Sequence, residues 1–307
     1  MSEPRRTALL IVNPAARAAD HGRADRVAAV LEERLALERV ETKARGHAME
    51  LAASAAEDRL DLVVVLGGDG TLNEVANALA GTATPVAILP GGEANVFARS
   101  MGLPRDPVAA ARIVAAKAGS PRRVPLGRAG DRWFTANCGV GFDGAIVRAV
   151  EAHPDAKRRL GDLFFVWTAT RVFATGYDRR TPRLSVTWGP GDDDRVDHAY
   201  VAIVQNLSPF TYLGRRAMRV APDADLGLNL DALILDSMRI GTVLPVALST
   251  FARARHGRNR HARIVHDVPW FDVRSEVPLP LQADGEYLGD HTEVRIECVP
   301  DALGLVG

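Results

Sequence analysis

The segment Leu62–Val75, LVVVLGGDGTLNEV, constrains the fold of this chain more than any other. Its first five residues are apolar, the glycine-rich run Gly67–Thr71 follows, and a helical pattern begins at once. A buried strand, a glycine turn and a helix N-terminus in this order present backbone N–H groups that bind phosphate. The run also contains Asp69, which would repel a phosphate unless a cation lay between them, so we expect Mg²⁺ there. The segment predicts a nucleotide-phosphate site, whereas the simpler interpretation is a tight turn with a capping aspartate.

The first third of the chain alternates strand and helix patterns. Strands are expected at Ala8–Val12, Arg39–Ala44, Leu62–Leu66 and Val86–Leu89, and helices at Arg23–Leu37, Met49–Ala56, Leu72–Leu79 and Pro107–Lys117. This alternation predicts an α/β N-terminal domain with a mainly parallel sheet. Ligands of such sheets bind at the carboxyl ends of the strands, and the turns after Val12, Leu66 and Leu89 all lie there. We therefore expect these three turns to form one site.

Strand patterns dominate beyond about Pro125. They cover Trp133–Cys138, Arg183–Trp188, His198–Gln205, Leu230–Leu235, Ala262–His266, Trp270–Val273 and Glu293–Cys298, with helices near Arg159–Ala174 and Val243–Ala254. We expect a nucleotide-binding α/β domain over residues 1–125 and a β-rich, sandwich-like domain over residues 126–307. The last strand can return to the first domain. The run Gly189–Asp194 is typical of an exposed hairpin loop.

Charge and hydropathy exclude several classes of function. Basic and acidic residues number 38 each, which gives no electrostatic case for binding nucleic acid. No apolar window reaches the roughly 18 residues of a spanning helix, and the N-terminal apolar run is too short for a secretion signal. We therefore expect a cytoplasmic protein with at most peripheral membrane contact. The segment Arg253–Arg263 has five arginines and two histidines in eleven residues, and it is either a solvated helix end or a surface for anionic lipid.

Three further motifs carry polar residues. Pro90-Gly91-Gly92 with Asn95 repeats the order of strand, glycine pair and helix. Asp284-Gly285-Glu286 is typical of a hairpin tip, and the alternative is a functional carboxylate. Gly139–Gly144 matches GxGxxG, but a further helix follows where a dinucleotide fingerprint needs a strand, so we do not assign it to a dinucleotide. Asp143, within this run, can still face an active cleft.

Six motifs in order resemble the diacylglycerol kinase catalytic-domain family, the bacterial lipid kinases akin to sphingosine and ceramide kinases. The motifs are Asn13-Pro14; Thr42 with Gly46-His47-Ala48; Gly67–Thr71 with Asn73-Glu74-Val75; Pro90–Gly92 with Asn95 and Phe97–Arg99; Asn137, Gly139 and Gly141–Asp143; and Asp284–Glu286. The match covers nearly the whole chain, and the order of the motifs is more specific than any one of them.

The resemblance implies a two-domain enzyme that transfers the γ-phosphoryl group of ATP to the hydroxyl of a lipid such as diacylglycerol. By the same resemblance Glu286 is the general base, and Asp69 holds Mg²⁺ directly or through water. Asp231 lies in a looser match to the family's loop for a structural Mg²⁺. Groups that would bind the nucleotide and its phosphates are the amides of Gly67, Gly68, Gly70 and Gly92, the hydroxyl of Thr71, and the side chains of Asn13, Thr42 and Asn95.

Three positions depart from the family pattern and leave alternatives open. Ala15-Ala16-Arg17 replaces a glycine turn, Glu93 replaces Thr or Ser, and Val96 replaces Asp. One alternative is a nucleotide- or lipid-binding homologue that has lost catalysis. Another is a kinase of a soluble substrate such as NAD, because NAD kinases share the GGDG turn. The acceptor lipid is not specified by the sequence, and a homodimer stays open.

Overall fold

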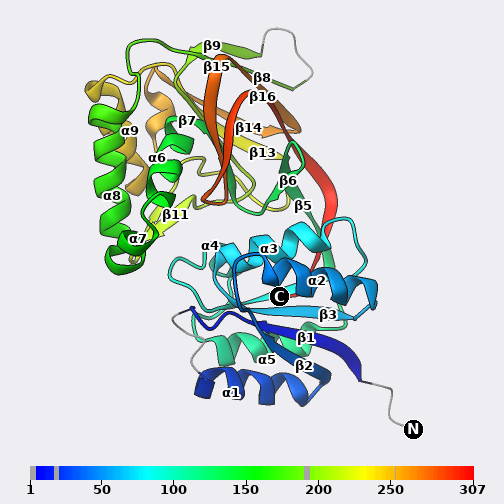
Figure 1. Cartoon of the computed structure of the whole chain (residues 1–307). Coiled ribbons are helices and arrows are strands. Elements are labelled where there is room, and N and C mark those ends of the chain that lie inside the picture. The colour runs from blue at the N-terminus through cyan, green and yellow to red at the C-terminus, as the bar shows by residue number, and fades with distance from the viewer. Residues whose placement is uncertain (1–4, 17–20, 190–193, 253) are drawn as a thin grey trace. The chain divides into compact units, whose positions relative to one another are not determined.

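The computed structural model describes residues 5–16, 21–189, 194–252 and 254–307. Arg17, Arg253 and four residues of the expected Gly189–Asp194 loop lie outside these ranges. The chain separates into two compact units (Figure 1). Unit 1 comprises Met1–Leu126 together with Pro300–Gly307, and unit 2 comprises Gly127–Val299.

Unit 1 is built on a parallel sheet with helices on both faces. Its strands are β1 (Arg6–Val12), β2 (Leu35–Glu41), β3 (Leu62–Gly67), β4 (Val86–Pro90) and the end of β16 (Glu286–Leu305). Its helices are α1 (His21–Glu32), α2 (His47–Glu57), α3 (Asp69–Leu79), α4 (Val96–Ser100) and α5 (Pro107–Lys117). The strand order is β16-β4-β3-β1-β2. Figure 1 shows α1 and α5 on one face of the sheet, with α2 and α3 on the other.

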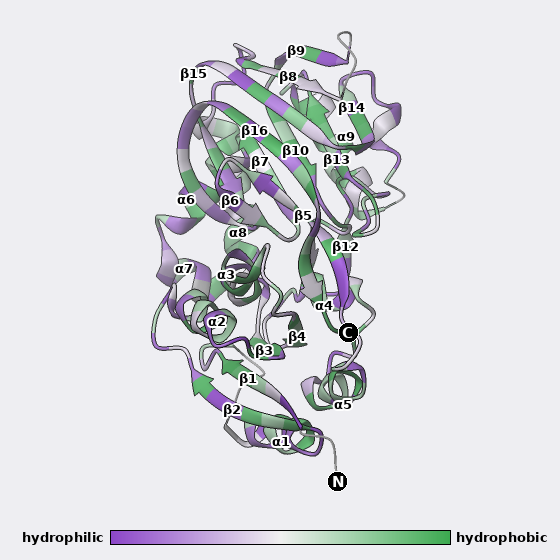
Figure 2. Ribbon diagram, turned by 90° about the vertical axis from the view of Figure 1, so that its right-hand side faces the viewer, coloured by the Kyte–Doolittle hydropathy of each residue, from purple (hydrophilic) through white to green (hydrophobic). Residues whose placement is uncertain are grey.

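The apolar run of the sequence forms the central strand of this sheet. β3 pairs in parallel with β1 on one side and β4 on the other, and all six of its residues are buried. Helices on both faces exclude water, which explains why β3 has no polar alternation. The hydrophobic colour of β1 and β3 in Figure 2 shows the same pattern. The predicted α/β fold with a parallel sheet is therefore confirmed for this part of the chain.

The expected helix Arg23–Leu37 is wrong at its C-terminal end. α1 ends at Glu32, and Leu35 begins β2, which ends at Glu41 rather than Ala44. Leu31 and Leu35 are both buried and lie four residues apart, so their spacing imitates a helix across the turn between the two elements.

Unit 2 is β-rich, as predicted. Its strands are β5 (Arg122–Ala129, shared with unit 1), β6 (Arg132–Phe134), β7 (Asn137–Gly141), β8 (Leu184–Trp188), β9 (Arg195–Ala199), β10 (Val201–Gln205), β11 (Thr211–Leu213), β12 (Arg216–Met218), β13 (Leu230–Leu235), β14 (Ala262–Val268), β15 (Trp270–Ala283) and most of β16. Its helical segments are α6 (Phe142–Glu151), α7 (Pro154–Leu160), α8 (Asp162–Arg171), the π-helical turn η1 (Val172–Gly176), α9 (Ile240–Phe251) and the 3₁₀ turn η2 (His256–Arg258).

The long strand β15 belongs to both layers of this sandwich. Its first half pairs with β8 and its second half pairs with β7, with a register shift between Arg274 and Leu279. One hydrophobic cluster, which includes Trp188, Phe271 and Ile296, fills the space that these strands enclose. On β10 and β13 the alternate side chains face the other way, into a cluster to which α9 contributes Val246. The helices therefore cover the outer face of the sheet.

Two expected strands of unit 2 are each divided in the structure. Trp133–Cys138 forms β6 and β7, because the N–H groups of Thr135 and Ala136 bond to the Asp284 carboxylate. His198–Gln205 forms β9 and β10, with a left-handed backbone at His198 (φ 71°). Within the described ranges, every helix is too short or too polar to cross a bilayer.

Candidate functional site

Two glycine turns meet backbone to backbone at the carboxyl ends of β3 and β4. The N–H of Gly91 donates to the carbonyl of Gly67 over 2.8 Å. A methyl group at Gly92 would lie 2.7 Å from Cα of Gly68, and one at Gly91 would lie 3.0 Å from Cα of Gly67. Real side chains do not tolerate such distances from rigid backbone, so the contact requires glycine.

Asp69 links the two turns through hydrogen bonds. Its carboxylate oxygens accept the N–H groups of Val96 and Phe97, each over 3.0 Å, at the first turn of α4. These amides have no partner within the helix, so a carboxylate stabilises them. Val96 thus contributes its backbone, and its side chain is buried. The sequence left open a metal-binding and a capping role for Asp69, and in the structure its carboxylate caps α4.

Asn95 closes the second turn on itself. Its Oδ1 accepts the N–H of Gly92 and its Nδ2 donates to the carbonyl of Gly92, both over 2.8 Å. Asn95 has a left-handed backbone with φ 46°, which asparagine tolerates better than most residues. The Gly92 amide, which was expected to bind phosphate, is thus bound by Asn95 in this conformation.

Asn13 joins the end of β1 to the start of α3. Its backbone N–H donates to the carbonyl of Leu66 over 3.0 Å, and its Nδ2 donates to Oγ1 of Thr71 over 2.8 Å. Its Oδ1 accepts the N–H of Ala15. The backbone N–H of Thr42 donates to the carbonyl of Val12 over 2.8 Å, which places the following loop beside the same strand end.

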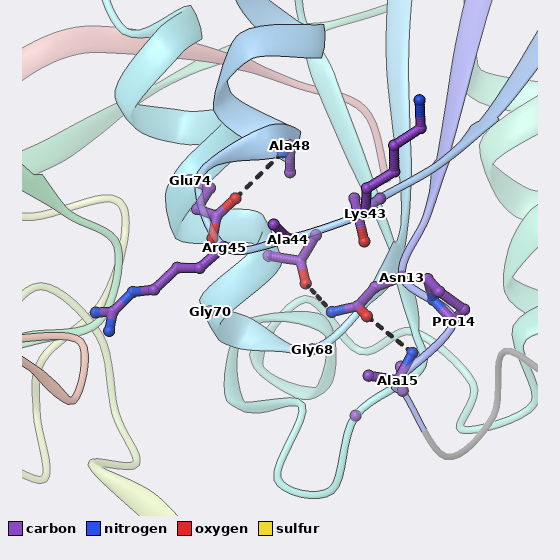
Figure 3. Close-up of a pocket in the computed structure, with 14 residues that line it drawn as sticks. Asn13, Pro14, Ala15, Lys43, Ala44, Arg45, Ala48, Gly68, Gly70 and Glu74 are labelled. Carbon is purple, nitrogen blue, oxygen red and sulfur yellow. Dashed lines mark hydrogen bonds between the residues drawn. The ribbon is translucent and has the colours of Figure 1, made fainter. Parts of the chain in front are cut away.

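A pocket of about 550 Å³ lies over these strand ends (Figure 3). Its lining is Asn13, Pro14, Ala15, Ala16, Thr42, Lys43, Ala44, Arg45, Ala48, Gly68, Gly70, Thr71, Glu74 and Gly92. Six predicted nucleotide-binding residues therefore meet there: Asn13, Thr42, Gly68, Gly70, Thr71 and Gly92. Within the described part of the chain, Gly67, Asp69, Glu93 and Asn95 do not belong to this lining.

The N-terminus of α3 is exposed to this pocket. The first hydrogen bond of the helix runs from the N–H of Leu72 to the carbonyl of Gly68. The amides of Gly70 and Thr71 precede that bond, and Gly68 has no side chain with which to cap them. Together with the helix dipole, such amides favour an anion. The pocket is therefore suited to a phosphate group.

The three charged residues of the pocket lining were not predicted as site residues. Glu74, to which the sequence assigned no chemical role, accepts the N–H of Ala48 over 3.2 Å and so holds the first turn of α2. Lys43 and Arg45 come from the loop between β2 and α2, and in Figure 3 they extend in opposite directions away from Gly68 and Gly70. Their position beside the Gly46-His47-Ala48 motif was the available signal.

In unit 2, Asp284 fixes the hairpin between β15 and β16. Its carboxylate accepts N–H groups from Thr135, Ala136 and Asn137 and the hydroxyl of Thr135, over 2.6–2.9 Å. The turn uses left-handed backbone at Asp284 (φ 48°) and Gly285 (φ 79°). The hairpin tip suggested by the sequence is thus present. It positions Glu286, the first residue of β16, whose carboxylate accepts a hydrogen bond from Arg132 over 2.6 Å.

Gln282 links two further polar residues beneath this hairpin. Its Nε2 donates to Oδ1 of Asn137 over 2.9 Å and to Oδ2 of Asp143 over 2.7 Å. Asp143 is buried, and burial raises its pKa from 3.8 to about 6, with the Gln282 hydrogen bond opposing the shift. The Asn137 and Asp143 motif residues therefore belong with Asp284 in one network of unit 2.

The contacts of Asp231 differ from those expected of a residue in a metal-binding loop. It lies within β13, is fully buried, and accepts Nδ1 of His266 over 2.9 Å and the N–H of Asp267 over 3.0 Å. The hydrogen bond that His266 donates to the Asp231 carboxylate raises the pKa of His266. Across the described residues, no group of three or more His, Cys, Asp or Glu side chains is arranged to hold a metal ion.

We predict that Gly92→Ala lowers the free energy of unfolding of unit 1 by about 1–3 kcal/mol, because its methyl group must displace Gly68. Urea denaturation measures this change. Gly70→Ala is the matched control, since nothing lies within 4 Å of the added atom and alanine favours a helix. Equal stability of the Gly92→Ala variant and the wild type would refute the close contact.

We predict that Asp143→Asn gains stability relative to the wild type as pH rises. A raised pKa in the folded state stabilises the wild type at low pH, and this contribution is lost as pH rises through about 6. The difference should grow by up to about 3 kcal/mol between about pH 4 and pH 7. Urea denaturation at several pH values checks it. Asp178→Asn should show no such gain, because hydrogen bonds lower the pKa of Asp178.

The family model for the diacylglycerol kinase catalytic domain matches residues 7–129. A probable lipid kinase YegS-like protein of Chromohalobacter salexigens is 38% identical over 265 residues, covering 85% of this chain and 80% of that protein. A probable lipid kinase YegS-like protein of Stenotrophomonas maltophilia is 30% identical over 275 residues, covering 83% and 81%.

Solved structures share the fold. The crystal structure of a diacylglycerol kinase from Bacillus anthracis superimposes with a TM-score of 0.77 and 22% identity, covering 99% of this chain and 98% of that one. At this identity the likeness bears on the fold alone, whereas the sequence matches bear on the family. The chain therefore belongs to the YegS-like lipid kinases, a family that carries the diacylglycerol kinase catalytic domain.

Proposed function

We propose that this lipid kinase transfers the γ-phosphoryl group of ATP to the hydroxyl of a membrane lipid such as diacylglycerol. The observation that carries the proposal is the pocket of unit 1, where the N-terminus of α3 lies open beside Gly68 and Gly70. We assign the phosphates of ATP to the amides of Gly70 and Thr71. Asn13 and Thr42 line the same pocket and are assigned to positioning the nucleotide.

The pocket also fits a magnesium ion bound with ATP. Mg²⁺ keeps several waters and binds through one or two carboxylates together with substrate phosphates. Glu74 lines the pocket, and Asp69 lies between two of its lining residues, Gly68 and Gly70. The ion would neutralise charge on the transferring phosphoryl group. We assign Asp69 and Glu74 to it, and we assign no ion to Asp231, because His266 and the amide of Asp267 already bind its carboxylate.

Glu286 is proposed as the general base. As the lipid hydroxyl oxygen forms its bond to the γ-phosphorus, Glu286 takes the hydroxyl proton, and the bond to the bridging oxygen breaks to release ADP. Asp284 makes the turn before Glu286 rigid, and Arg132 orients the Glu286 carboxylate through a hydrogen bond of 2.6 Å.

Glu93 gives little support to the alternative of lost catalysis. This residue is absent from the pocket lining among the described residues, so it does not place an anion on the pocket wall. Val96, the other departure, still provides the backbone amide that Asp69 binds. We therefore favour an active kinase over a binding-only homologue, and a lipid acceptor over a soluble one because the curated relatives are named lipid kinases.

We predict that Gly70→Ala weakens binding of Mg²⁺·ATP at least about tenfold while leaving stability unchanged, because the methyl group enters the space proposed for phosphate. Isothermal titration calorimetry measures the affinity. Gly241→Ala, which also adds a methyl group in open space but in unit 2, is the control. Unchanged affinity in the Gly70→Ala variant would contradict the assignment of phosphate to this helix end.

We predict that Glu286→Gln lowers kcat by about 10²–10⁴ with little change in ATP affinity, because only proton removal is lost. The measurement is phosphate transfer from labelled ATP to a panel of lipid alcohols, followed by mass spectrometry. Glu293→Gln, on the same strand and exposed, is the control. Full activity of the Glu286→Gln variant would remove Glu286 from catalysis, and no labelled lipid with the wild type would count against the lipid kinase activity itself.

A further inference from the structure

Helix α9 of unit 2 presents an apolar stripe to solvent. Ile240, Leu244 and Leu248 are 60%, 51% and 62% exposed, and their spacing of four residues places them on one face. On the opposite face Val246 is buried and packs with Leu233 and Leu235 of the sheet. The helix is therefore anchored by one side only, and its free side is apolar.

This outward face differs from that of an ordinary surface helix. The exposed side of a helix in a water-soluble protein normally carries charged or polar residues. Residues 240–252 contain no charged residue, and the exposed positions among them are apolar or glycine. Exposing these apolar side chains to water is unfavourable. Binding to a surface that covers them would therefore be favoured.

Positive charge surrounds the stripe. From Ser237 to His266 the chain has six arginines and no acidic residue, although the whole chain has no net charge. Arg239 precedes α9, and Arg255 and Arg258 follow it. The hairpin of β11 and β12 adds the exposed Arg215, Arg216 and Arg219, and the backbone N–H of Arg219 donates to the carbonyl of Thr250 in α9 over 2.8 Å.

We propose that this surface docks the protein on an anionic phospholipid bilayer. We call it the α9 patch, defined as Ile240, Leu244 and Leu248 with the arginines 215, 216, 219, 239, 255 and 258. The apolar stripe enters the boundary between headgroups and acyl chains, while the arginines bind the anionic headgroups. This inference deepens the proposed function, since it gives a lipid kinase a route to its acceptor, but it needs neither ATP nor catalysis.

Charge favours a bilayer over a second copy of the chain as the occupant. A symmetric dimer through the α9 patch would bring the same surface of both copies together. The arginines of one copy would then face those of the other, and such like-charge contacts oppose association. An anionic membrane supplies the opposite charge, and it accepts an apolar stripe without a complementary groove.

The test is flotation of the full chain with vesicles, without nucleotide or acceptor lipid. We expect binding to vesicles of phosphatidylglycerol and phosphatidylcholine, weaker binding to phosphatidylcholine alone, and a loss of binding as salt rises from about 0.05 M to about 0.5 M. The double variant Leu244→Ser, Leu248→Ser should bind at least about tenfold less. Arg255→Gln with Arg258→Gln should weaken binding to the anionic vesicles only.

Leu228→Ser is the matched control, because Leu228 is also exposed but lies at the opposite end of β13 from α9. It should bind as the wild type does. Hydrogen exchange of the wild type supplies a readout without mutation, and it should slow over residues 240–251 when anionic vesicles are added. Equal binding by the leucine variant, no binding by the wild type, or a wild-type dimer that the leucine variant dissociates would each overturn the proposal. Because no nucleotide is present, these failures are distinct from failure of the kinase activity.

Discussion

The backbone contact between the two glycine turns is the constraint on which the pocket of unit 1 depends. Gly68 and Gly92 approach so closely that a methyl group on either would meet the other backbone. Asp69 then fixes the first turn of α4 to this contact through two hydrogen bonds. The glycines therefore do more than free a loop for phosphate. They allow two neighbouring strand ends to lie in contact, which leaves the N-terminus of α3 open at the pocket floor.

In unit 2 a carboxylate that accepts backbone N–H groups likewise fixes the hairpin between β15 and β16. Asp284, like Asp69, is a carboxylate whose oxygens accept backbone N–H groups of a separate segment. Hydrogen bonds from backbone amides to a charged acceptor are stronger than neutral ones and fix the geometry of a turn. In both units the acid of a short motif thus positions its neighbours. In unit 2 the neighbour is Glu286, the residue proposed to take the proton.

Much of unit 1 could be predicted from sequence because its signals are local. The run of β-branched residues at Val63–Val65 and the glycines after it define a strand, a turn and a helix within a few residues. The partners of Asp69 could not be predicted in this way. Its acceptor role depends on Val96 and Phe97, 27 and 28 residues away, which only the parallel pairing of β3 and β4 brings near.

Of the remaining differences, one is a local effect and two are non-local. The amide of Gly92 was expected to bind phosphate, but the left-handed backbone of Asn95 turns its side chain back onto that amide. Asp231 was expected in a metal loop, but pairing of β13 with β14 places His266 beside it. The division of β6 from β7 follows from Asp284, almost 150 residues further along the chain. For Asp231 and Asp284 the partner is brought near by the pairing of distant strands, which residue spacing along the sequence does not predict.

The most direct test of this account is an NMR titration of the isotope-labelled chain with a non-hydrolysable ATP analogue and Mg²⁺, read at individual backbone amides. If the N-terminus of α3 holds the phosphates, the amide signals of Gly70 and Thr71 shift strongly. The amide of Gly92, which Asn95 already binds, shifts much less. A large shift at Gly92 with none at Gly70 and Thr71 would contradict the central claim.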